Sequence, residues 1–164
     1  MKTLLIILSI IISETIMPQN YDFEQHLYQS YDRYKENSLT HRRFKHSDIT
    51  PLIDKLKHQK GFTVKVVGKS VEGRELKLIT IGKGKTKIFM WSQMHGDEPT
   101  ATASLFDIFN FINDPANKEF CTALLDRVTL YFLPMVNPDG AERFKRRNFY
   151  DIDLNRDASR LQCP

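Results

Sequence analysis

The sequence has few of the residues that define small disulfide scaffolds or membrane proteins. Its two cysteines, Cys121 and Cys163, are too few for a disulfide framework or a zinc ribbon, and the sequence leaves open whether they pair. Its apolar run at residues 4–12 is far shorter than the roughly 20 residues that a membrane-spanning helix needs. We therefore expect neither a cross-linked scaffold nor a stable membrane anchor.

The excess of charge of one sign is also small. The chain has 24 Lys and Arg against 20 Asp and Glu, a net charge of +4. Such a balance does not require nucleic acid or an acidic surface as a partner. The basic run at residues 41–46 lies in a very polar stretch and is typical of a solvated face. We expect no nucleic-acid partner.

The composition that is present is that of a globular protein, with 41% hydrophobic and 27% charged residues. Residues 1–17 resemble a secretory signal peptide, which predicts a secreted or periplasmic protein. Residues 18–47 form a polar, irregular or partly helical lead-in. Residues 48–164 carry the periodic patterns and are expected to form the folded domain.

The first patterns of this domain predict a helix followed by a β-hairpin. Apolar residues recur at helical spacing over residues 49–56, and Gly61 is expected to end this helix. The period then changes to two at residues 62–66 and again at residues 76–81, with a turn near Gly73. This alternation is typical of two paired strands.

The next patterns predict a crossover between two buried strands. Residues 87–92 and 128–133 are apolar on both faces, which suits central strands covered by helices. Between them, residues 98–113 have helical periodicity, with Asp97 as the expected N-cap. A strand, a helix and a strand in this order indicate an α/β fold with helices on a sheet.

The candidate chemistry begins where the first buried strand ends, at residues 92–99 (SQMHGDEP). The carboxyl ends of strands are where open α/β sheets bind ligands. His95 and Glu98 are three positions apart across a tight turn at Gly96, so both side chains can reach one Zn²⁺ ion. The alternative is a helix start whose acidic first turn favours the helix dipole.

Two later motifs favour the metal site. Residues 134–140 (PMVNPDG) follow the second buried strand, and residues 146–156 (RRNFYDIDLNR) come next. Alone, these are a good turn and a solvated basic loop. Together with residues 92–99 they resemble the zinc carboxypeptidase family, that of pancreatic carboxypeptidase A. The resemblance implies that His95 and Glu98 are the first two zinc ligands of an enzyme that cleaves peptides near a free C-terminal carboxylate.

The resemblance also implies roles for the last motif. Arg146, nine positions before Asn155, matches the arginine that polarises the scissile carbonyl and stabilises the oxyanion. Arg147 takes this role if the alignment shifts by one position. Asn155 and Arg156 match the pair that holds the terminal carboxylate of the substrate, a task that suits the planar guanidinium fork.

The family also uses a third zinc ligand, a downstream histidine, and a glutamate as general base, and neither can be assigned in this sequence. The family fold is moreover a larger mixed sheet flanked by helices. We therefore expect residues 48–164 to be a truncated, incomplete catalytic domain, inactive by itself. The remaining histidines all precede the expected sheet and read as surface residues: His26, His41, His46 and His58.

Two further functions stay open. A zinc amidohydrolase of the desuccinylase or aspartoacylase type also has a His-x-x-Glu pair, although the Asn-Pro-Asp-Gly turn at residues 137–140 favours the peptidase. A non-catalytic module could keep the carboxylate clamp at residues 155–156 without zinc chemistry. Asp157 departs from the residues common in the family, so the substrate preference is open, as is the oligomeric state.

Overall fold

The computed structural model describes residues 19–163, and the chain divides into two compact units, Met1–Tyr34 and Lys35–Pro164. The described part of the first unit is one polar helix, α2 (Gln19–Tyr34). The expected signal peptide at residues 1–17 lies outside the described residues. Within the described part, no helix combines the length and the apolar character that crossing a membrane requires.

The second unit is built on a four-stranded mixed sheet with the order β1-β2-β4-β3. β1 pairs antiparallel with β2, β2 pairs antiparallel with β4, and β3 pairs parallel with β4. The predicted hairpin and the predicted α/β sheet are therefore confirmed. The strands are β1 (Thr63–Lys69), β2 (Glu75–Gly82), β3 (Thr86–Trp91) and β4 (Val128–Leu133).

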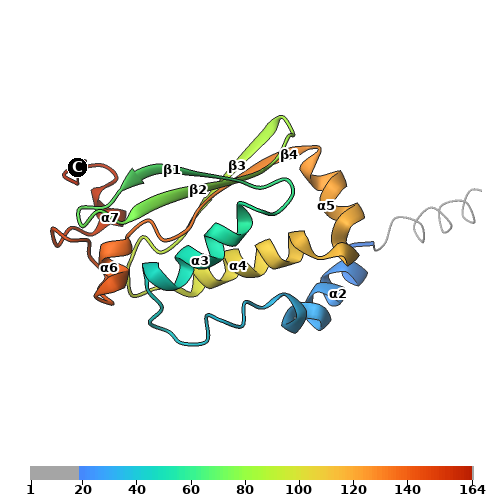
Figure 1. Ribbon diagram of the computed structural model, residues 1–164, viewed down its shortest axis with the longest axis horizontal. Helices are drawn as coiled ribbons and strands as arrows, with labels where there is room; N and C mark the ends of the chain where they lie inside the picture. Colours follow the sequence, from blue (N-terminus) through green and yellow to red (C-terminus); the bar gives the residue numbers. More distant parts are fainter. Residues whose placement is uncertain (1–18, 164) are drawn as a thin grey trace, which may run out of the picture. The chain divides into compact units, whose positions relative to one another are not determined.

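Helices cover one face of this sheet (Figure 1). The helix predicted before the hairpin is α3 (His46–Leu56). The crossover from β3 to β4 consists of α4 (Thr100–Asn113), a short 3₁₀ turn η1 (Pro115–Asn117) and α5 (Lys118–Leu125). Two short helices follow β4, namely α6 (Pro138–Glu142) and α7 (Leu154–Asp157).

The core lies between α3, α4 and the helix-facing side of the sheet. Phe109 of α4 is 1% exposed and makes edge-to-face contacts with three other rings. The ring centroids of Phe62, Phe106 and Phe132 lie 5.9, 5.6 and 4.9 Å from that of Phe109. Such contacts contribute roughly 0.5–1.5 kcal/mol each beyond the burial of apolar area. They pack α4 against β4 and against the residue that precedes β1.

Helix α4 begins later than predicted, at Thr100, with Pro99 as its N-cap. The prediction of Asp97 as N-cap is wrong, and the buried Oδ1 atom of Asp97 has no hydrogen-bond partner among the described residues. The cause is local. The ring of a proline disfavours helical backbone angles in the residue before it, so Glu98 cannot belong to the helix. Glu98 lies instead in the loop that carries His95.

Strand β3 differs from its prediction as a central strand, because it is an edge strand among the described residues. Its register with β4 places Phe89 opposite Tyr131 and Trp91 opposite Leu133. Phe89 is 51% exposed and Trp91 is 52% exposed, and their rings pack together with centroids 5.5 Å apart. The strand is apolar on both faces, as the sequence indicates. The prediction that both faces are buried is wrong, because Phe89 and Trp91 are exposed.

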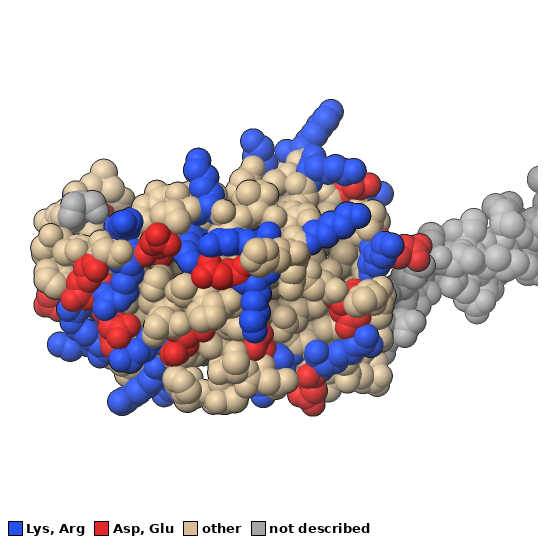
Figure 2. Space-filling model, viewed as in Figure 1, with Lys and Arg blue, Asp and Glu red and all other residues tan. Residues whose placement is uncertain are grey.

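Both cysteines are free thiols. Cys121 is buried in α5, as the sequence indicates, and this burial raises the pKa of its thiol. On the protein surface, acidic side chains lie between the basic ones over much of the face shown in Figure 2. The expectation of no nucleic-acid partner stays a prediction.

Candidate metal centre and substrate pockets

The sequence motifs meet at the carboxyl ends of the two parallel strands. His95 and Glu98 lie in the loop that follows β3, and residues 137–140, predicted as a turn, form the N-cap and the first residues of α6 after β4. Because β3 and β4 run in the same direction, both loops leave the sheet at one edge. This edge is where the predicted zinc ligands and the predicted arginine come together.

Four side chains form a closed ring of polar contacts at this edge, which we call the four-residue ring. The Nδ1 atom of His95 lies 3.0 Å from Oε2 of Glu98, and its Nε2 atom lies 3.0 Å from Oδ1 of Asp153. Arg146 closes the ring, since its Nε donates to Oδ2 of Asp153 and its Nη1 donates to Oε1 of Glu98, each at 3.1 Å. Segments that are far apart in sequence thus share one polar cluster.

Asp153 is the member of the ring that sequence reasoning missed. Removal from water opposes ionisation of this carboxyl, but hydrogen bonds from His95 and Arg146 and the charge of Arg146 outweigh that effect and hold its pKa at about 2. Asp153 is therefore an anion at neutral pH. Its position two residues before Asn155, inside the last motif, was the signal that could have identified it.

The His95–Glu98 pair fits half of a zinc site. With Asp153 accepting the hydrogen on Nε2, the Nδ1 lone pair of His95 is directed at Glu98 and is available to a metal. Two atoms bound to one tetrahedral zinc ion at about 2.1 Å lie about 3.4 Å apart, close to the observed separation. Glu98, with its side chain 59% exposed, has room to rotate by that small amount. Among residues 19–163, no group of three or more His, Cys, Asp or Glu side chains is arranged to hold a metal ion.

The buried side chain of Asn137 links the loop after β3 to the segment that carries Arg146. This side chain is 2% exposed, and its Nδ2 atom donates to the carbonyl oxygens of Met94 and Arg146, each at 3.2 Å. Its Oδ1 atom accepts from the backbone N–H of Gly140 at 2.9 Å. One buried amide therefore fixes the backbone of Arg146 relative to the loop that carries His95 and Glu98.

Gly96 lies in the tight turn that the sequence predicts, closed by the hydrogen bond from the backbone N–H of Glu98 to the carbonyl oxygen of His95 at 3.1 Å, and it also allows the two loops to approach closely. A Cβ atom on Gly96 would collide with the backbone of Gly140 and Ala141. The strained residue of this loop is Gln93, with a φ of 52°. Its buried amide donates to the carbonyl of Gly96 and accepts from Thr102 of α4, so the loop is anchored to the helix.

The structure separates the two arginines that the sequence left as alternatives. Arg146 belongs to the four-residue ring. Arg147 instead donates to the backbone carbonyl of Asp151 at 2.7 Å and has its side chain 53% exposed. Among the described residues, Arg146 is the one of these two arginines that contacts the His95–Glu98 pair.

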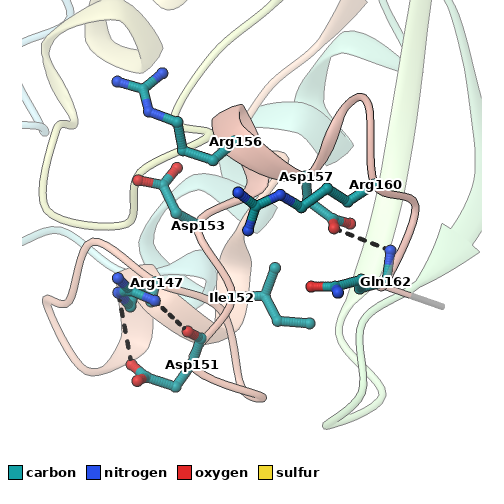
Figure 3. A pocket seen from close by; sticks show the side chains of 8 residues that line it. All are labelled: Arg147, Asp151, Ile152, Asp153, Arg156, Asp157, Arg160 and Gln162. Carbon is teal, nitrogen blue, oxygen red and sulfur yellow. Dashed lines mark hydrogen bonds and ion pairs between the residues drawn. The ribbon is translucent and has the colours of Figure 1, made fainter.

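Two pockets lie beside the ring. One, of about 490 Å³, is lined by His95 and Glu98 together with Asn155 and Trp91. The other, of about 410 Å³, is shown in Figure 3, and we call it the arginine pocket. Asn155 and Arg156 were expected to act together. Asn155, however, lines the pocket beside His95 and Glu98, whereas Arg156 lines the arginine pocket. The arginine pocket is lined by Arg147, Asp151, Ile152, Asp153, Arg156, Asp157, Arg160 and Gln162.

The fold and the site together define an α/β protein whose polar centre lies at the carboxyl ends of the parallel strands of a mixed sheet. Residues 49–160 match the family described as zinc carboxypeptidase, and the chain belongs to that family. This match covers the four-residue ring and the residues that line the arginine pocket as far as Arg160.

Individual relatives agree with this assignment. Carboxypeptidase SOL1 of Arabidopsis thaliana is 36% identical over 98 residues, which cover 56% of this chain. A solved metallo-carboxypeptidase from Burkholderia cenocepacia has a TM-score of 0.63 and 26% identity over 68% of this chain. The metallo-carboxypeptidase from Pseudomonas aeruginosa, solved with (2-guanidinoethylmercapto)succinic acid, has a TM-score of 0.60 and 26% identity over 73% of this chain.

The chain spans only part of these relatives. It covers 20% of the Arabidopsis protein and 31% and 32% of the two bacterial structures. The sheet and its flanking helices have the zinc carboxypeptidase fold over the matched region.

Proposed function

We propose that this chain carries the first part of a zinc-dependent metallocarboxypeptidase, which hydrolyses a peptide bond next to a free C-terminal carboxylate. The observation that carries the proposal is the four-residue ring, in which an oriented histidine, a glutamate and an arginine meet at the carboxyl edge of the sheet. Family membership over residues 49–160 supports it. It also favours the peptidase over the related amidohydrolase.

The residues of the ring have distinct roles in this proposal. His95 and Glu98 hold Zn²⁺, which when bound lowers the pKa of its water and polarises the scissile carbonyl. Asp153 keeps the imidazole of His95 in the orientation and tautomer that ligation needs. Arg146 presents a fixed cation beside the metal pair, where negative charge develops on the carbonyl oxygen in the transition state.

The substrate partner is a peptide with a free C-terminal carboxylate. Arg156 is exposed, and its guanidinium group has no hydrogen bond or ion pair with another described residue. A guanidinium without an acceptor is suited to bidentate binding of a carboxylate. In the proposal Arg156 holds the terminal carboxylate and so selects the last peptide bond, while the role expected for Asn155, which lines the other pocket, stays a prediction.

Zinc binding by the whole chain tests the metal site. We expect competition against a chromophoric chelator to show that His95→Ala and Glu98→Ala each weaken zinc binding about tenfold or more. His58→Ala is the matched control, because His58 is exposed and has no role in the ring. Equal affinities of the wild type and His95→Ala would remove the metal site from the proposal.

We further propose that the 164-residue chain is itself inactive. Two protein ligands hold zinc loosely, and a hydrolytic site usually has three. We expect no hydrolysis of N-acylated dipeptides by the purified, zinc-loaded chain above the rate without protein. Robust hydrolysis that a chelator abolishes would contradict this expectation.

A non-catalytic carboxylate-binding module is the second candidate, and the unpaired guanidinium of Arg156 favours it. This candidate predicts that His95→Ala leaves the binding of a C-terminal peptide unchanged and that Arg156→Ala abolishes it. A zinc carboxypeptidase predicts that His95→Ala also alters peptide binding in the presence of zinc, because the scissile carbonyl then loses its metal contact. Titration of both variants with and without zinc separates the two functions.

The organisation of the chain is part of the proposal. Residues 1–17 are proposed as a signal peptide, residues 18–47 as a lead-in and residues 48–164 as the incomplete catalytic domain, in a secreted or periplasmic protein. N-terminal sequencing of the chain from its native source tests export. A mature chain that still begins at Met1 would contradict it.

A further inference from the structure

The arginine pocket has more positive charge available to a ligand than its composition suggests. Three arginines and three aspartates line it (Figure 3), so its formal charge is balanced. What a ligand meets depends on which of these groups are already paired within the protein. The acidic and the basic groups differ sharply in this respect.

The two partly or fully buried carboxylates of the pocket already have donors. Asp153 has both oxygens engaged in the four-residue ring. Asp157 is 6% exposed, and its two oxygens accept the backbone N–H groups of Gln162 and Cys163 at 2.9 and 2.8 Å. Neither carboxylate is therefore free to attract a cationic ligand.

The remaining charged groups divide into one pair and two free cations. Arg147 and Asp151 are bonded to each other, through the backbone carbonyl and at 4.0 Å through the carboxylate. The guanidinium groups of Arg156 and Arg160 form no hydrogen bond or ion pair within residues 19–163. The pocket thus offers a ligand two unpaired guanidinium groups.

These two arginines lie four positions apart in the chain. Arg156 lies in α7, and the backbone N–H of Arg160 donates to the carbonyl of Asp157 at 2.8 Å, so the chain keeps turning after the helix. Helix α7 itself ends at Asp157, and in Figure 3 the side chain of Arg160 lies across the pocket while that of Arg156 extends past Asp153 on its other side. The side chain of Asp157 stabilises the following loop by its two backbone hydrogen bonds. Asp157, the residue that departs from the family pattern, therefore supports the position of Arg160.

We propose that the arginine pocket selects substrates with an acidic C-terminal residue, Arg156 binding the terminal carboxylate and Arg160 binding the side-chain carboxylate of Asp or Glu. This inference rests on the proposed function, since it adds a side-chain preference to the same carboxylate clamp. Two guanidinium forks that line one pocket match two carboxylates of one amino acid, and each pair is a charge-assisted, bidentate interaction. Arg160 is a specificity-determining residue in this arrangement.

Peptide binding by the full chain tests the inference. The probes are N-acetyl-Ala-Glu and N-acetyl-Ala-Leu, titrated by NMR into the wild type and into Arg156→Gln, Arg160→Gln and Arg127→Gln. Arg127 is the matched control, an exposed arginine just before β4 that does not line the pocket. We expect the wild type to bind the acidic peptide about tenfold more tightly, as one added charge-assisted contact predicts. Arg160→Gln should make the two affinities equal, and Arg127→Gln should change neither.

The outcomes separate this inference from the proposed function. Equal affinities in the wild type, or an acidic preference that survives Arg160→Gln, would overturn the inference. If Arg156→Gln still weakens the binding of the Leu peptide in that case, the carboxylate clamp of the proposed function stands. Failure of both peptides to bind, or binding of the Leu peptide that Arg156→Gln leaves unchanged, would overturn the clamp and the inference together.

Discussion

The carboxylate of Asp153 lies 3.0 Å from the Nε2 atom of His95, although 58 positions separate them in the sequence. The same carboxylate accepts from Arg146 through its other oxygen. One anion therefore orients both the proposed metal ligand and the proposed oxyanion-stabilising cation. Loss of this anion should affect both functions at once, while leaving the ligands themselves in place.

We expect Asp153→Asn to weaken zinc binding about 10- to 100-fold, because an amide neither holds the imidazole tautomer as firmly nor adds negative charge behind it. Chelator competition with the whole chain measures this. Asp151→Asn is the control, since Asp151 has the same chemistry two positions away but has its side chain 88% exposed and lies outside the ring. A wild-type zinc affinity in Asp153→Asn, or an equal loss in both variants, would show that Asp153 does not position His95.

Gly96→Ala should destabilise the domain by about 1–3 kcal/mol or more, because the new methyl group collides with backbone atoms that cannot rotate away. Urea denaturation followed by circular dichroism measures the loss. Gly68→Ala is the matched control, because its Cβ would lie 3.7 Å from a side-chain carbon of Leu76, an ordinary contact. If Gly96→Ala is as stable as Gly68→Ala, the close packing of the two loops is not required.

Much of the site could be predicted because its residues occur in short motifs with fixed local geometry. His95 and Glu98 are neighbours in one loop, and their separation follows from three positions of backbone. The strands were predictable for a similar reason. Runs that alternate between apolar and polar residues, and short runs that are apolar at every position, are both typical of β-strands. The strands predicted at residues 62–66, 76–81, 87–92 and 128–133 are all present, as β1, β2, β3 and β4, with ends that differ by a few residues at most.

The rest depends on contacts that no local pattern encodes. Asn137 reads as a turn residue, and its amide bonds to Met94 and Arg146 follow only from the docking of two distant loops. Whether β3 is central or at an edge is likewise decided by which strands pair with it, not by its own sequence. The start of α4 is different, because the effect of Pro99 on Glu98 is local and could have been anticipated.

The amide of Asn137 offers a test of loop docking with almost no change in shape. In Asn137→Asp, an oxygen replaces the nitrogen that donates to two carbonyl oxygens, so two buried acceptors lose their donor and face a repulsive group. We expect a loss of about 2–4 kcal/mol in the free energy of unfolding at pH 7. Asn113→Asp is the control, because the exposed Asn113 donates only to Phe109 of its own helix. Equal urea midpoints for the two variants would contradict a docking role.

The carboxylate of Asp139 connects the turn between β1 and β2 to helix α6. It is 2% exposed and accepts from the hydroxyl of Ser70 at 2.7 Å, from the guanidinium of Arg74 at 2.6 Å and from the backbone N–H of Glu72 at 3.2 Å. Burial opposes its ionisation, but these hydrogen bonds and the charge of Arg74 prevail and lower its pKa below the ordinary value of 3.8. The folded state therefore favours the ionised form of Asp139.

This direction sets the sign of the last prediction. A carboxyl whose pKa is lowered by folding contributes stability that is fully present above the unfolded-state pKa and is lost as the pH falls through the folded-state pKa. Asp139→Asn should therefore cost about 2–4 kcal/mol at pH 7, since it leaves Arg74 without its buried partner. The difference from the wild type should stay constant above about pH 5 and shrink below the ordinary value of 3.8. Urea midpoints measured from pH 7 to pH 3 test this, with Asp126→Asn, which removes only an exposed pair with Lys83, as the control. A difference that is independent of pH, or that grows in acid, would show that the ionised carboxylate of Asp139 does not stabilise the turn.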